Sequence, residues 1–578
     1  MSYKDQYNYW LSNPYFDEAT KAELKNIEND EKEIEERFYK DLEFGTGGLR
    51  GVIGAGTNRM NEYVVRKATQ GFANYLLKTV EAVKNKGVVI AYDCRHKSDV
   101  FAETAALVLA ANGIKAYLFE SLRTTPELSF SVRELGCAGG IVITASHNPP
   151  EYNGYKVYGE DGGQIVPDTA EKIIREIQDI KDYADVKYIN KEDALDKGLL
   201  EIIGEEVDKK YIDKVKSLVL RKEVIERMKD MKIIYTPLHG TGNMPVRRVL
   251  NEIGFENVIV VNEQEIPDPN FSTVKSPNPE EHEAFTLAME LAKKHGADVI
   301  IGTDPDCDRV GVVVKNNEGK YQVLTGNQTG ALLIDYLLSS MKERNSIPEN
   351  GVIIKTIVTS KMGEKIAKSF GVETLDTLTG FKFIGEKMKE FEENKEKTFL
   401  FGYEESYGYL AGTFVRDKDA VIASMLICEM AAYYKSEGMT LYDALMKLYE
   451  KYGYYQEDLV SITLKGKEGL EKIQRILAYL RDNTPKSIAG KEIKVFRDYD
   501  ISKGINLSTG EEEILTLPKS NVLHFTFTDD SWFCVRPSGT EPKVKIYFSV
   551  MGESLEDAKE QLINVKNGVM EIINTFSL

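Results

Sequence analysis

The sequence has few cysteines, no long apolar run and no excess of positive charge. Its cysteines are odd in number and scattered: Cys94, Cys137, Cys307, Cys428 and Cys534. Without any C-x-x-C pair they exclude a disulfide framework and a cysteine zinc site, and they indicate a reducing, intracellular setting. No run of 18 apolar residues and no signal-peptide core occur, so we expect a soluble, cytoplasmic protein. The net charge of −18 argues against nucleic acid or an anionic membrane as partner and requires a locally basic pocket for an anionic substrate.

The 578 residues suggest roughly four domains, at about 150 residues each. Helix and strand patterns alternate from Tyr63 to Phe119, and the alternation restarts near Val207 and near Gly326. The last part has several strands and ends in a helix, Leu555–Phe576. We therefore predict three similar α/β domains with mixed, mostly parallel sheets plus a C-terminal α+β domain, around one central cleft. The predicted bounds are 1–206, with a helical N-terminal extension whose charged helices are solvent-exposed, then 207–325, 326–455 and 456–578.

The segment Gly139–Pro150 contains the first candidate for chemistry. Its apolar run Ile141–Ile143 and the prolines after it predict a buried strand that ends before Ser146. Open α/β sheets bind ligands at the carboxyl ends of their strands, and a hydroxyl there, beside His147 and near Lys156, suits a nucleophile or a carrier of a phosphoryl group. A strand followed by a polar turn explains the segment equally well.

The glycine-rich segment Phe44–Gly51 fits neither of the common nucleotide loops. It lacks the Lys-Ser/Thr of a P-loop, and Arg50 stands where a dinucleotide fingerprint needs its third glycine. One hypothesis is a backbone that approaches a phosphate closely, with Arg50 as a bidentate donor. The alternative is a glycine turn with a surface arginine.

The loop Asp304–Arg309, between two apolar strands, carries three carboxylates at alternate positions. Pro305 keeps the backbone out of a helix, so Asp304, Asp306 and Asp308 can converge on one hard cation. Without a cation, neighbouring donors would have to neutralise three like charges. We predict Mg²⁺, because its sites usually combine few protein carboxylates with phosphate oxygens and water.

An EF-hand also opens with this carboxylate spacing, but the loop does not continue as one. Its sixth position is Arg309 rather than glycine, its twelfth is Lys315 rather than glutamate, and strands replace the flanking helices. Cys307 is too soft a ligand for Mg²⁺ and is expected to pack inward.

Polar loops follow apolar strands in the two remaining domains as well. Glu404 and Ser406 suit recognition of vicinal sugar hydroxyls, although an acidic surface turn has the same pattern. Arg416–Asp419 adds groups that can face a phosphate or form a salt-bridged helix start. Arg536–Lys543 combines an arginine, two hydroxyls and a glycine, which can present backbone N–H groups to a dianion. One cleft can gather the four loops, one from each predicted domain.

These loops, in this order, resemble the signature loops of the α-D-phosphohexomutases: Thr144–Pro149, Asp304–Arg309, Gly402–Ser406 and Arg536–Thr540. Tyr92–Ser98 resembles another recurring segment of that family. The first loop, Gly45–Arg50, and the helical N-terminal extension are most similar to its phosphoglucomutase branch, which also contains phosphopentomutases. The resemblance spans nearly the whole chain.

The resemblance implies an isomerase that interconverts α-D-glucose 1-phosphate and glucose 6-phosphate through a phosphoserine enzyme and a glucose 1,6-bisphosphate intermediate. Ser146 would carry the phosphoryl group and, with Asp304, Asp306 and Asp308, would hold one Mg²⁺. The implied catalytic set also contains His147, Arg50, Arg309 and Lys418. The implied substrate-binding set is Lys156, Thr379, Gly380, Lys382, Glu404, Ser406, Arg536, Ser538, Gly539 and Thr540. The general base stays open between His147, which has a suitable pKa, and Lys418, which would need a lowered one.

Sugar preference stays open, because Tyr403 and Tyr407 stand around the sugar loop where family members vary. Phosphomannomutase or phosphopentomutase activity is therefore the alternative. A phosphatase of the haloacid dehalogenase type, with a nucleophilic aspartate, would leave Ser146 without a role. A catalytically silent sugar-phosphate sensor is the other rival. Because water competes as acceptor, we predict that the last domain closes about a hinge near Tyr454–Glu457.

Overall fold

The computed structural model describes residues 2–45, 47–464, 466–538 and 543–575. The chain forms two compact units: the first is Met1–Val352 with Gly380–Tyr442, and the second is Ile353–Thr379 with Asp443–Leu578. In the part of the chain described, no helix is both long enough and apolar enough to cross a membrane.

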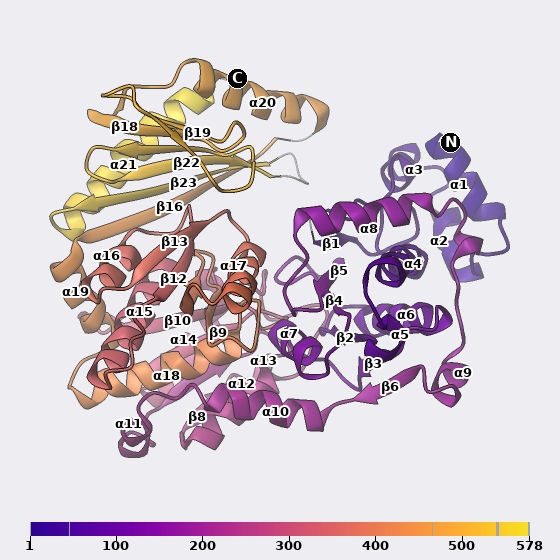
Figure 1. Ribbon diagram of the computed structural model, residues 1–578, viewed down its shortest axis with the longest axis horizontal. Helices are drawn as coiled ribbons and strands as arrows, with labels where there is room; N and C mark the ends of the chain where they lie inside the picture. Colours follow the sequence, from indigo (N-terminus) through magenta and orange to yellow (C-terminus); the bar gives the residue numbers. More distant parts are fainter. Residues whose placement is uncertain (1, 46, 465, 539–542, 576–578) are drawn as a thin grey trace. The chain divides into compact units, whose positions relative to one another are not determined.

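The first sheet has six strands in the order β1-β5-β4-β2-β3-β6 (Figure 1). They are β1 (Gly48–Val52), β2 (Val88–Tyr92), β3 (Ala116–Phe119), β4 (Gly139–Ile143), β5 (Tyr152–Gly159) and β6 (Leu200–Ile203). The pairs among β4, β2, β3 and β6 are parallel, whereas β5 runs antiparallel to both β4 and β1. The sheet is therefore mixed and mostly parallel, and β4 delivers Ser146 at its carboxyl end.

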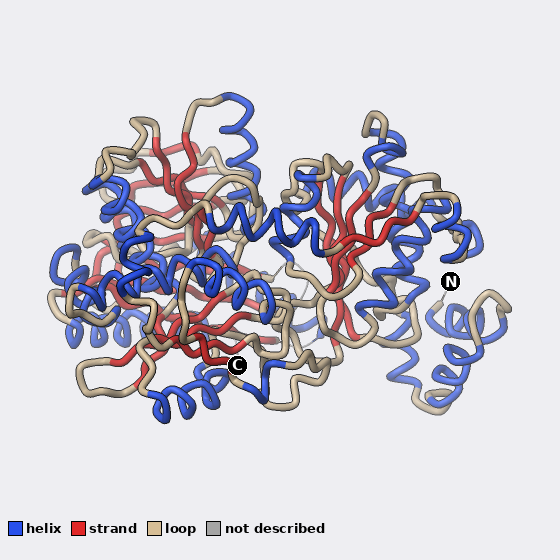
Figure 2. The backbone as a smooth tube through the Cα atoms, turned by 90° about the horizontal axis from the view of Figure 1, so that it is seen from below, coloured by secondary structure: helices blue, strands red, loops and turns tan. Residues whose placement is uncertain are grey.

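Helices cover both faces of this sheet, as Figure 2 shows for the strands drawn in red. A Cβ atom on Gly139 would lie 3.2 Å from Phe72 of α4 (Glu62–Thr79), and one on Gly140 would lie 2.7 Å from Val132 of α7 (Thr125–Glu134). Successive strand residues point to opposite faces, so α4 and α7 lie on opposite sides. Helices α6 (Ser98–Ala111) and α8 (Pro167–Asp179) pack against α4.

The second sheet has the order β11-β10-β9-β7-β8. Its strands are β7 (Ile233–Thr236), β8 (Val258–Val260), β9 (Val299–Thr303), β10 (Val310–Lys315) and β11 (Tyr321–Leu324). Strand β7 pairs in parallel with β8 and β9, and β9, β10 and β11 are antiparallel. The aspartate loop is thus the turn of the β9–β10 hairpin, and Cys307 in it is fully buried, as expected.

The first unit also contains the antiparallel pair β14 (Thr398–Tyr403) and β15 (Tyr409–Ala411), whose turn holds Glu404. Its other long helices include α10 (Glu205–Lys216), α12 (Asn243–Ile253), α14 (Thr286–His295), α15 (Gly326–Glu343), α17 (Phe381–Asn394) and α18 (Ala420–Ser436). Shorter helices are α5 (Val83–Lys86), α9 (Lys191–Asp196), α11 (Lys222–Arg227) and α13 (Asn262–Glu265).

The N-terminal helices α1 (Tyr3–Ser12), α2 (Glu18–Asn26) and α3 (Glu31–Phe38) differ from the solvated extension that the sequence predicts. Their outer faces are charged, but their inner faces share an aromatic cluster. Trp10 is fully buried and stacks on Phe16 at 4.2 Å between ring centroids. It also meets Tyr63 of α4 edge-on at 5.6 Å, so the cluster fixes the extension to the first sheet's covering layer.

The second unit is built on an antiparallel sheet in the order β16-β23-β22-β21-β18-β19-β20, with β17 paired to β18. Its strands are β16 (Tyr454–Thr463), β17 (Ser487–Ile488), β18 (Lys491–Asp498), β19 (Lys503–Asn506), β20 (Glu512–Ile514), β21 (Leu523–Phe527), β22 (Trp532–Pro537) and β23 (Lys543–Gly552). Residues of α20 (Gly466–Asp482) and α21 (Leu555–Asn574) join the sheet's apolar face in one core.

The remaining elements of this part of the chain are β12 (Gly351–Thr356), α16 (Met362–Ser369), β13 (Glu373–Thr377) and α19 (Leu441–Tyr452). The fold class is confirmed: three α/β domains with mixed sheets precede an antiparallel C-terminal domain. The sequence did not indicate α20 or strands β18 to β20. The predicted domain bounds and the hinge near Tyr454–Glu457, at the start of β16, stay predictions.

A buried carboxylate in α18 should make the stability of the first unit depend on pH. Glu429 is fully buried and accepts hydrogen bonds from the backbone N–H groups of Leu220, at 2.9 Å, and Arg221. Burial raises the pKa of Glu429 to about 7. A carboxyl with a raised folded-state pKa stabilises the fold fully only below its unfolded pKa, and that stability is lost as pH rises through about 7.

We compare the unfolding free energy of Glu429→Gln with that of the unsubstituted protein. We expect this difference to shift in favour of the variant by roughly 2 to 3 kcal/mol when the pH is raised from about 5 to about 8. Denaturant titration at the two pH values measures this difference. Glu437→Gln, at an exposed position at the end of the same helix, is the control. Identical pH dependence in all three proteins would contradict the assignment.

Candidate active site

Ser146 is held by its backbone and by two side chains just beyond β4. Its φ of 51° lies in the left-handed region that residues with a side chain rarely adopt, and its N–H donates to Thr144 Oγ1 at 2.9 Å. Its hydroxyl donates to Asp304 Oδ2 at 2.7 Å and lies 3.2 Å from His147 Nδ1. The first unit thus places the predicted nucleophile between a carboxylate and an imidazole.

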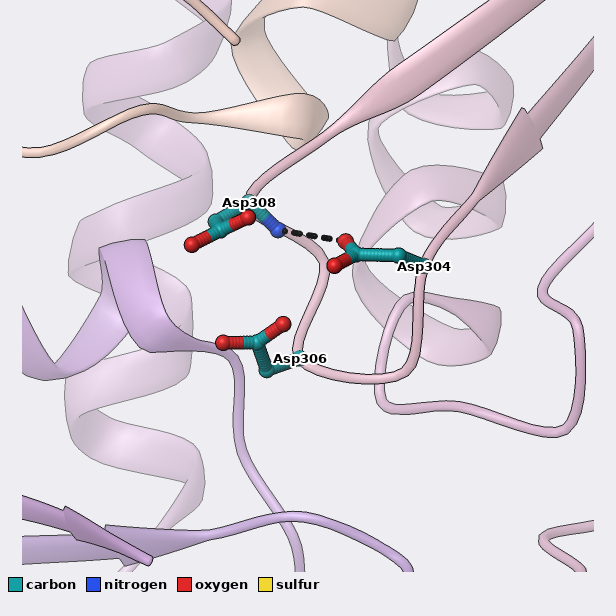
Figure 3. Close-up of side chains that lie close together, drawn as sticks. All are labelled: Asp304, Asp306 and Asp308. Atoms are coloured by element: carbon teal, nitrogen blue, oxygen red, sulfur yellow. Dashed lines mark hydrogen bonds between the residues drawn. The ribbon is translucent and has the colours of Figure 1, made fainter. Parts of the chain in front are cut away.

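The three aspartates converge as the sequence predicts (Figure 3). All three are buried, and one carboxylate oxygen from each lies within 4.8 Å of the others. Asp304 Oδ1 accepts the N–H groups of Asp308, at 3.1 Å, and Arg309, at 3.0 Å, which folds the loop back on itself. Burial, together with the charges of Asp306 and Asp308, raises the pKa of Asp304 well above its usual range.

Two lysines partly neutralise this cluster. Lys156 Nζ lies 2.8 Å from Asp306 Oδ2, and Lys418 Nζ lies 3.1 Å from Asp308 Oδ2. Burial disfavours the charged form of Asp306, but Lys156 and the hydrogen bonds to it hold its pKa well below the usual range. Burial likewise acts against the charge on Lys418, but Asp308 and Asp417 raise its pKa above the usual value.

The remaining carboxylate atoms fit a hard divalent cation. Asp306 Oδ1 and Asp308 Oδ1 are buried and, within the described residues, have no hydrogen-bond partner. Buried polar atoms without a partner are rare, and anionic oxygens are the donors that Mg²⁺ prefers. The buried triad is therefore consistent with a metal site.

The predicted sugar loop is joined to the aspartate loop by backbone hydrogen bonds. The N–H of Val310 donates to the carbonyl of Tyr407 at 3.1 Å, and that of Ala420 donates to Cys307 at 3.2 Å. Glu404 is buried and accepts the N–H of Gly380 at 2.9 Å, and burial raises the pKa of Glu404. These backbone hydrogen bonds hold the sugar loop and the aspartate loop next to each other within the first unit.

A glycine in this loop allows Lys418 to reach the aspartates. A Cβ atom on Gly408 would lie 2.2 Å from Lys418 Cδ, so any side chain there would displace the lysine. Only the glycine itself, beside a polar turn, marks this position in the sequence, and such a glycine often indicates a close approach.

The side chains of the other predicted residues of the first unit have weaker contacts with the aspartates and Ser146, or none that the described hydrogen bonds show. Arg50 on β1 donates to Asn148 Oδ1 at 3.4 Å, and Arg309 Nη1 lies 2.5 Å from Glu280 Oε1. Ser406 and Lys382, the latter in the first turn of α17, are half-buried. The first unit thus brings together Ser146, His147, Lys156, Asp304, Asp306, Asp308, Arg309, Glu404, Gly380 and Lys418.

Four predicted phosphate-binding positions and Thr379 belong to the second unit. Arg536 lies on β22 opposite Lys545 of β23, and the N–H of Ser538 donates to the carbonyl of Lys543 at 2.7 Å. Thr379 follows β13. Gly539 and Thr540 lie outside the described residues. The roles of these residues stay predictions.

Comparison with known proteins covers nearly the whole chain. Models of the phosphoglucomutase/phosphomannomutase alpha/beta/alpha domains I, II and III match residues 41–184, 209–319 and 325–452, and the model of the C-terminal domain matches 470–564. A phosphoglucomutase of Staphylococcus haemolyticus (strain JCSC1435) is 39% identical over 530 residues, which are 92% of this chain and 94% of that protein. A phosphoglucomutase of Staphylococcus epidermidis (strain ATCC 35984) is 38% identical and covers 95% of this chain and 99% of its own length.

The chain belongs to the phosphoglucomutase/phosphomannomutase family. The crystal structure of a phosphomannomutase described as putative, from Thermus thermophilus, has the same fold at 22% identity. Its TM-score is 0.66, over 93% of this chain and 99% of that one.

In this family member, a buried ion pair that the sequence analysis left without a role supports the Ser146 loop. Arg95 donates to the carbonyls of Pro149, at 2.8 Å, and Tyr152, at 3.1 Å, and also to those of Ser146 and Asn148. Its Nε lies 3.4 Å from Asp93 Oδ2, and both side chains are fully buried. Arg95 thus holds the backbone at the nucleophile and in the residues that follow it.

Two hydroxyls extend this support. Thr144 Oγ1 donates to Asp93 at 2.7 Å, and Thr125 Oγ1 donates to Asp306 Oδ2 at 2.8 Å. The resemblance of Tyr92–Ser98 to a recurring family segment was a signal in the sequence for the contact between Thr144 and Asp93. No local signal marked Thr125, which lies 181 residues before its partner.

We expect Arg95→Lys to lower turnover about 100-fold with little change in KM, because an ammonium cannot hold four carbonyls and a displacement near 1 Å at the reacting atom has an effect of that size. Unpaired carbonyls should also lower the unfolding free energy by about 2 kcal/mol. Steady-state kinetics and denaturant titration measure the two effects. Arg175→Lys, at an exposed position on α8, is the control. Unchanged turnover in folded Arg95→Lys protein would show that the hydrogen bonds of the Arg95 guanidinium do not position Ser146.

Proposed function

We propose that this protein is a phosphoglucomutase that interconverts α-D-glucose 1-phosphate and glucose 6-phosphate. The single observation that carries the proposal is the 2.7 Å hydrogen bond from Ser146 Oγ to Asp304 of the buried triad, in which two carboxylate oxygens have no hydrogen-bond partner among the described residues. The relatives named phosphoglucomutase, which match more than nine-tenths of the chain, support glucose phosphate over the other sugars.

Ser146 is the proposed carrier of the phosphoryl group. In the transfer step the bond from Ser146 Oγ to phosphorus breaks while a sugar hydroxyl oxygen bonds to phosphorus, and the hydroxyl proton passes to a base. The resulting glucose 1,6-bisphosphate turns over in the site, and its other phosphoryl group returns to Ser146. Such transfers depend on positioning and on electrostatic stabilisation more than on covalent help from the protein.

Asp304, Asp306, Asp308 and one oxygen of phosphorylated Ser146 are the proposed ligands of one Mg²⁺. Bound there, the ion would supply Lewis-acid stabilisation of charge on the transferring group. Lys156, Lys418, Arg309 and Arg50 are the proposed donors of further positive charge. The contacts of Lys156 and Lys418 with Asp306 and Asp308 support their placement.

His147 is the proposed base of the two candidates. Its ring lies 3.2 Å from Ser146 Oγ, and burial, then the charges of Arg309 and Arg50, lower its pKa well below the usual range, which favours the neutral form that can accept a proton. Lys418, with its raised pKa, stays a cation.

The substrate-binding residues are assigned by role. Glu404 and Ser406, with Thr379, Gly380 and Lys382, are the proposed contacts to the sugar and its adjacent phosphate. The bond between Glu404 and Gly380 supports this grouping. Arg536, Ser538, Gly539 and Thr540 are the proposed contacts to the non-reacting phosphate. Five cysteines without a disulfide favour a reducing cytoplasmic location. Membership of the family supports small sugar phosphates as partners.

An assay with Mg²⁺ and a trace of glucose 1,6-bisphosphate tests the proposal. We expect glucose 1-phosphate to be converted to glucose 6-phosphate faster than mannose 1-phosphate or ribose 1-phosphate is converted. Faster conversion of another sugar would reassign the substrate within the family. Release of inorganic phosphate without isomerisation would favour the phosphatase rival, and binding without turnover would favour a sensor.

A further inference from the structure

The C-terminal sheet of the second unit lines a cavity of about 270 Å³ that no role described above uses. Three cationic side chains, a histidine and a tryptophan border it, and we name it the basic cavity: Lys355, Lys361, Arg497, His524 and Trp532. Lys361 stands at the start of α16, whereas the last three residues lie on β18, β21 and β22.

Strand register explains why this face of the sheet is polar. Arg497 pairs with His524, His524 pairs with Cys534, and Trp532 stands two residues before Cys534 on the same face. Their sequence neighbours point to the opposite face, where Phe525 and Phe533 join the apolar core shared with α20 and α21. The cavity is therefore built by strand alternation and not by a chance gap between loops.

Three cations border the cavity, whereas only two carboxylates, Glu364 and Asp376, are among its lining residues. Lys355 is buried and lies 2.7 Å from Asp376, and Arg497 pairs with Glu513 at 2.5 Å. For Lys361, the nearest carboxylate oxygen among the described residues belongs to Asp530, at 3.9 Å. That distance is too long for a hydrogen bond.

The protonation of the lining groups reflects the same imbalance. Burial, together with the charges of Arg497, Lys361 and Lys355, lowers the pKa of His524 well below its usual range. Burial also lowers the pKa of Lys361. An anion in the cavity would favour the charged forms of both groups.

We propose that the basic cavity binds the dianionic phosphate group of a small molecule, either inorganic phosphate or a phosphate ester. Its volume is below the range of about 300 to 1,000 Å³ that holds drug-sized ligands, which favours a compact anion over a nucleotide. The Arg497 guanidinium provides a donor fork that matches phosphate oxygens. A bound phosphate would link the segment from Lys355 to α16 with sheet strands much later in the chain.

This site is separate from the predicted phosphate loop at Arg536. Trp532 begins β22 and Arg536 lies four residues later, about 13 Å along an extended strand. The proposal goes beyond the mutase function and does not depend on it, because its test measures binding and not turnover.

Tryptophan fluorescence provides a local test, since the chain has two tryptophans and only Trp532 borders the cavity. Trp10→Phe leaves Trp532 as the sole indole. Titration of this protein with inorganic phosphate, and separately with glycerol 3-phosphate, is carried out at constant ionic strength with chloride as the compensating ion. We expect a saturable change in emission with at least one of the two; the one that saturates identifies the free anion or the ester as the source.

Lys361→Gln in the same background should weaken the apparent affinity at least tenfold, whereas Arg475→Gln, at an exposed position on α20, should leave it unchanged. Emission that responds to neither compound, or that responds equally in the Lys361 variant, overturns the proposal. If Trp10→Phe does not fold, the rise in melting temperature with phosphate is compared in otherwise unsubstituted protein. Because the Arg536 loop is also a proposed phosphate contact, the rise should be smaller in Lys361→Gln than in Arg475→Gln, and equal rises in both overturn the proposal.

Discussion

Ser146→Ala should lower isomerisation of glucose 1-phosphate by at least about 10⁴-fold, because loss of a covalent nucleophile has effects of this size or larger in other enzymes. The substitution removes the Oγ that contacts Asp304 and His147. It leaves the N–H bond to Thr144 and the carbonyl bond from Arg95 in place, because both involve the backbone. The variant should therefore fold normally while losing activity.

Ser424→Ala is the matched control, since Ser424 is a fully buried serine in α18. It should keep full activity. A phosphatase that uses an aspartate of the Asp304–Arg309 loop as nucleophile would keep its activity after the loss of Ser146. Substantial residual activity in folded Ser146→Ala protein would therefore reject the phosphoserine account and favour that rival.

Asp304→Asn should separate the catalytic role of the triad from its effect on stability. Loss of one anionic metal ligand should lower activity about 10³-fold, because Lewis-acid stabilisation is worth several kcal/mol in the transition state. The amide can still accept the N–H groups of Asp308 and Arg309 and donate to Ser146, so the loop geometry is kept.

Without metal, the same variant should be at least as stable as the unsubstituted protein. Burial and two neighbouring carboxylates raise the pKa of Asp304, so its contribution to stability is present at low pH and is lost as pH rises. Asparagine does not ionise, so the variant does not lose this stability as pH rises. Melting temperatures with and without Mg²⁺ at about pH 8 measure the effect, with Asp196→Asn at an exposed position as control. A variant that keeps both its activity and its Mg²⁺-dependent rise in melting temperature would contradict the metal site.

Features encoded within a short segment were predictable from the sequence. The apolar run before Ser146 gave the strand end, and alternate aspartates around Pro305 gave a converging triad. Helix α20 had a readable apolar spacing, with Ile473, Ile476, Leu477 and Leu480 buried on one face, yet it was missed among the strands of the last domain.

Features that depend on distant contacts were not predictable in this way. Arg95 meets the Ser146 loop from about fifty residues earlier, and Thr125 meets Asp306 from 181 residues earlier. The aromatic cluster of α1 to α3 similarly depends on Tyr63 in α4. Neither the protonation of Lys418 nor that of His147 follows from residue type, because each depends on burial and on charges brought together by the fold.

The most direct test is to follow one phosphoryl group through Ser146. Purified protein is incubated with glucose 1,6-bisphosphate, the modified residue is mapped by peptide mass spectrometry, and the protein is then mixed with glucose 1-phosphate. We predict phosphate on Ser146 after the first step, and its transfer to the sugar as bisphosphate in the second. Active protein with no phosphate on Ser146, or with a phosphorylated Ser146 that the sugar does not discharge, would contradict the account.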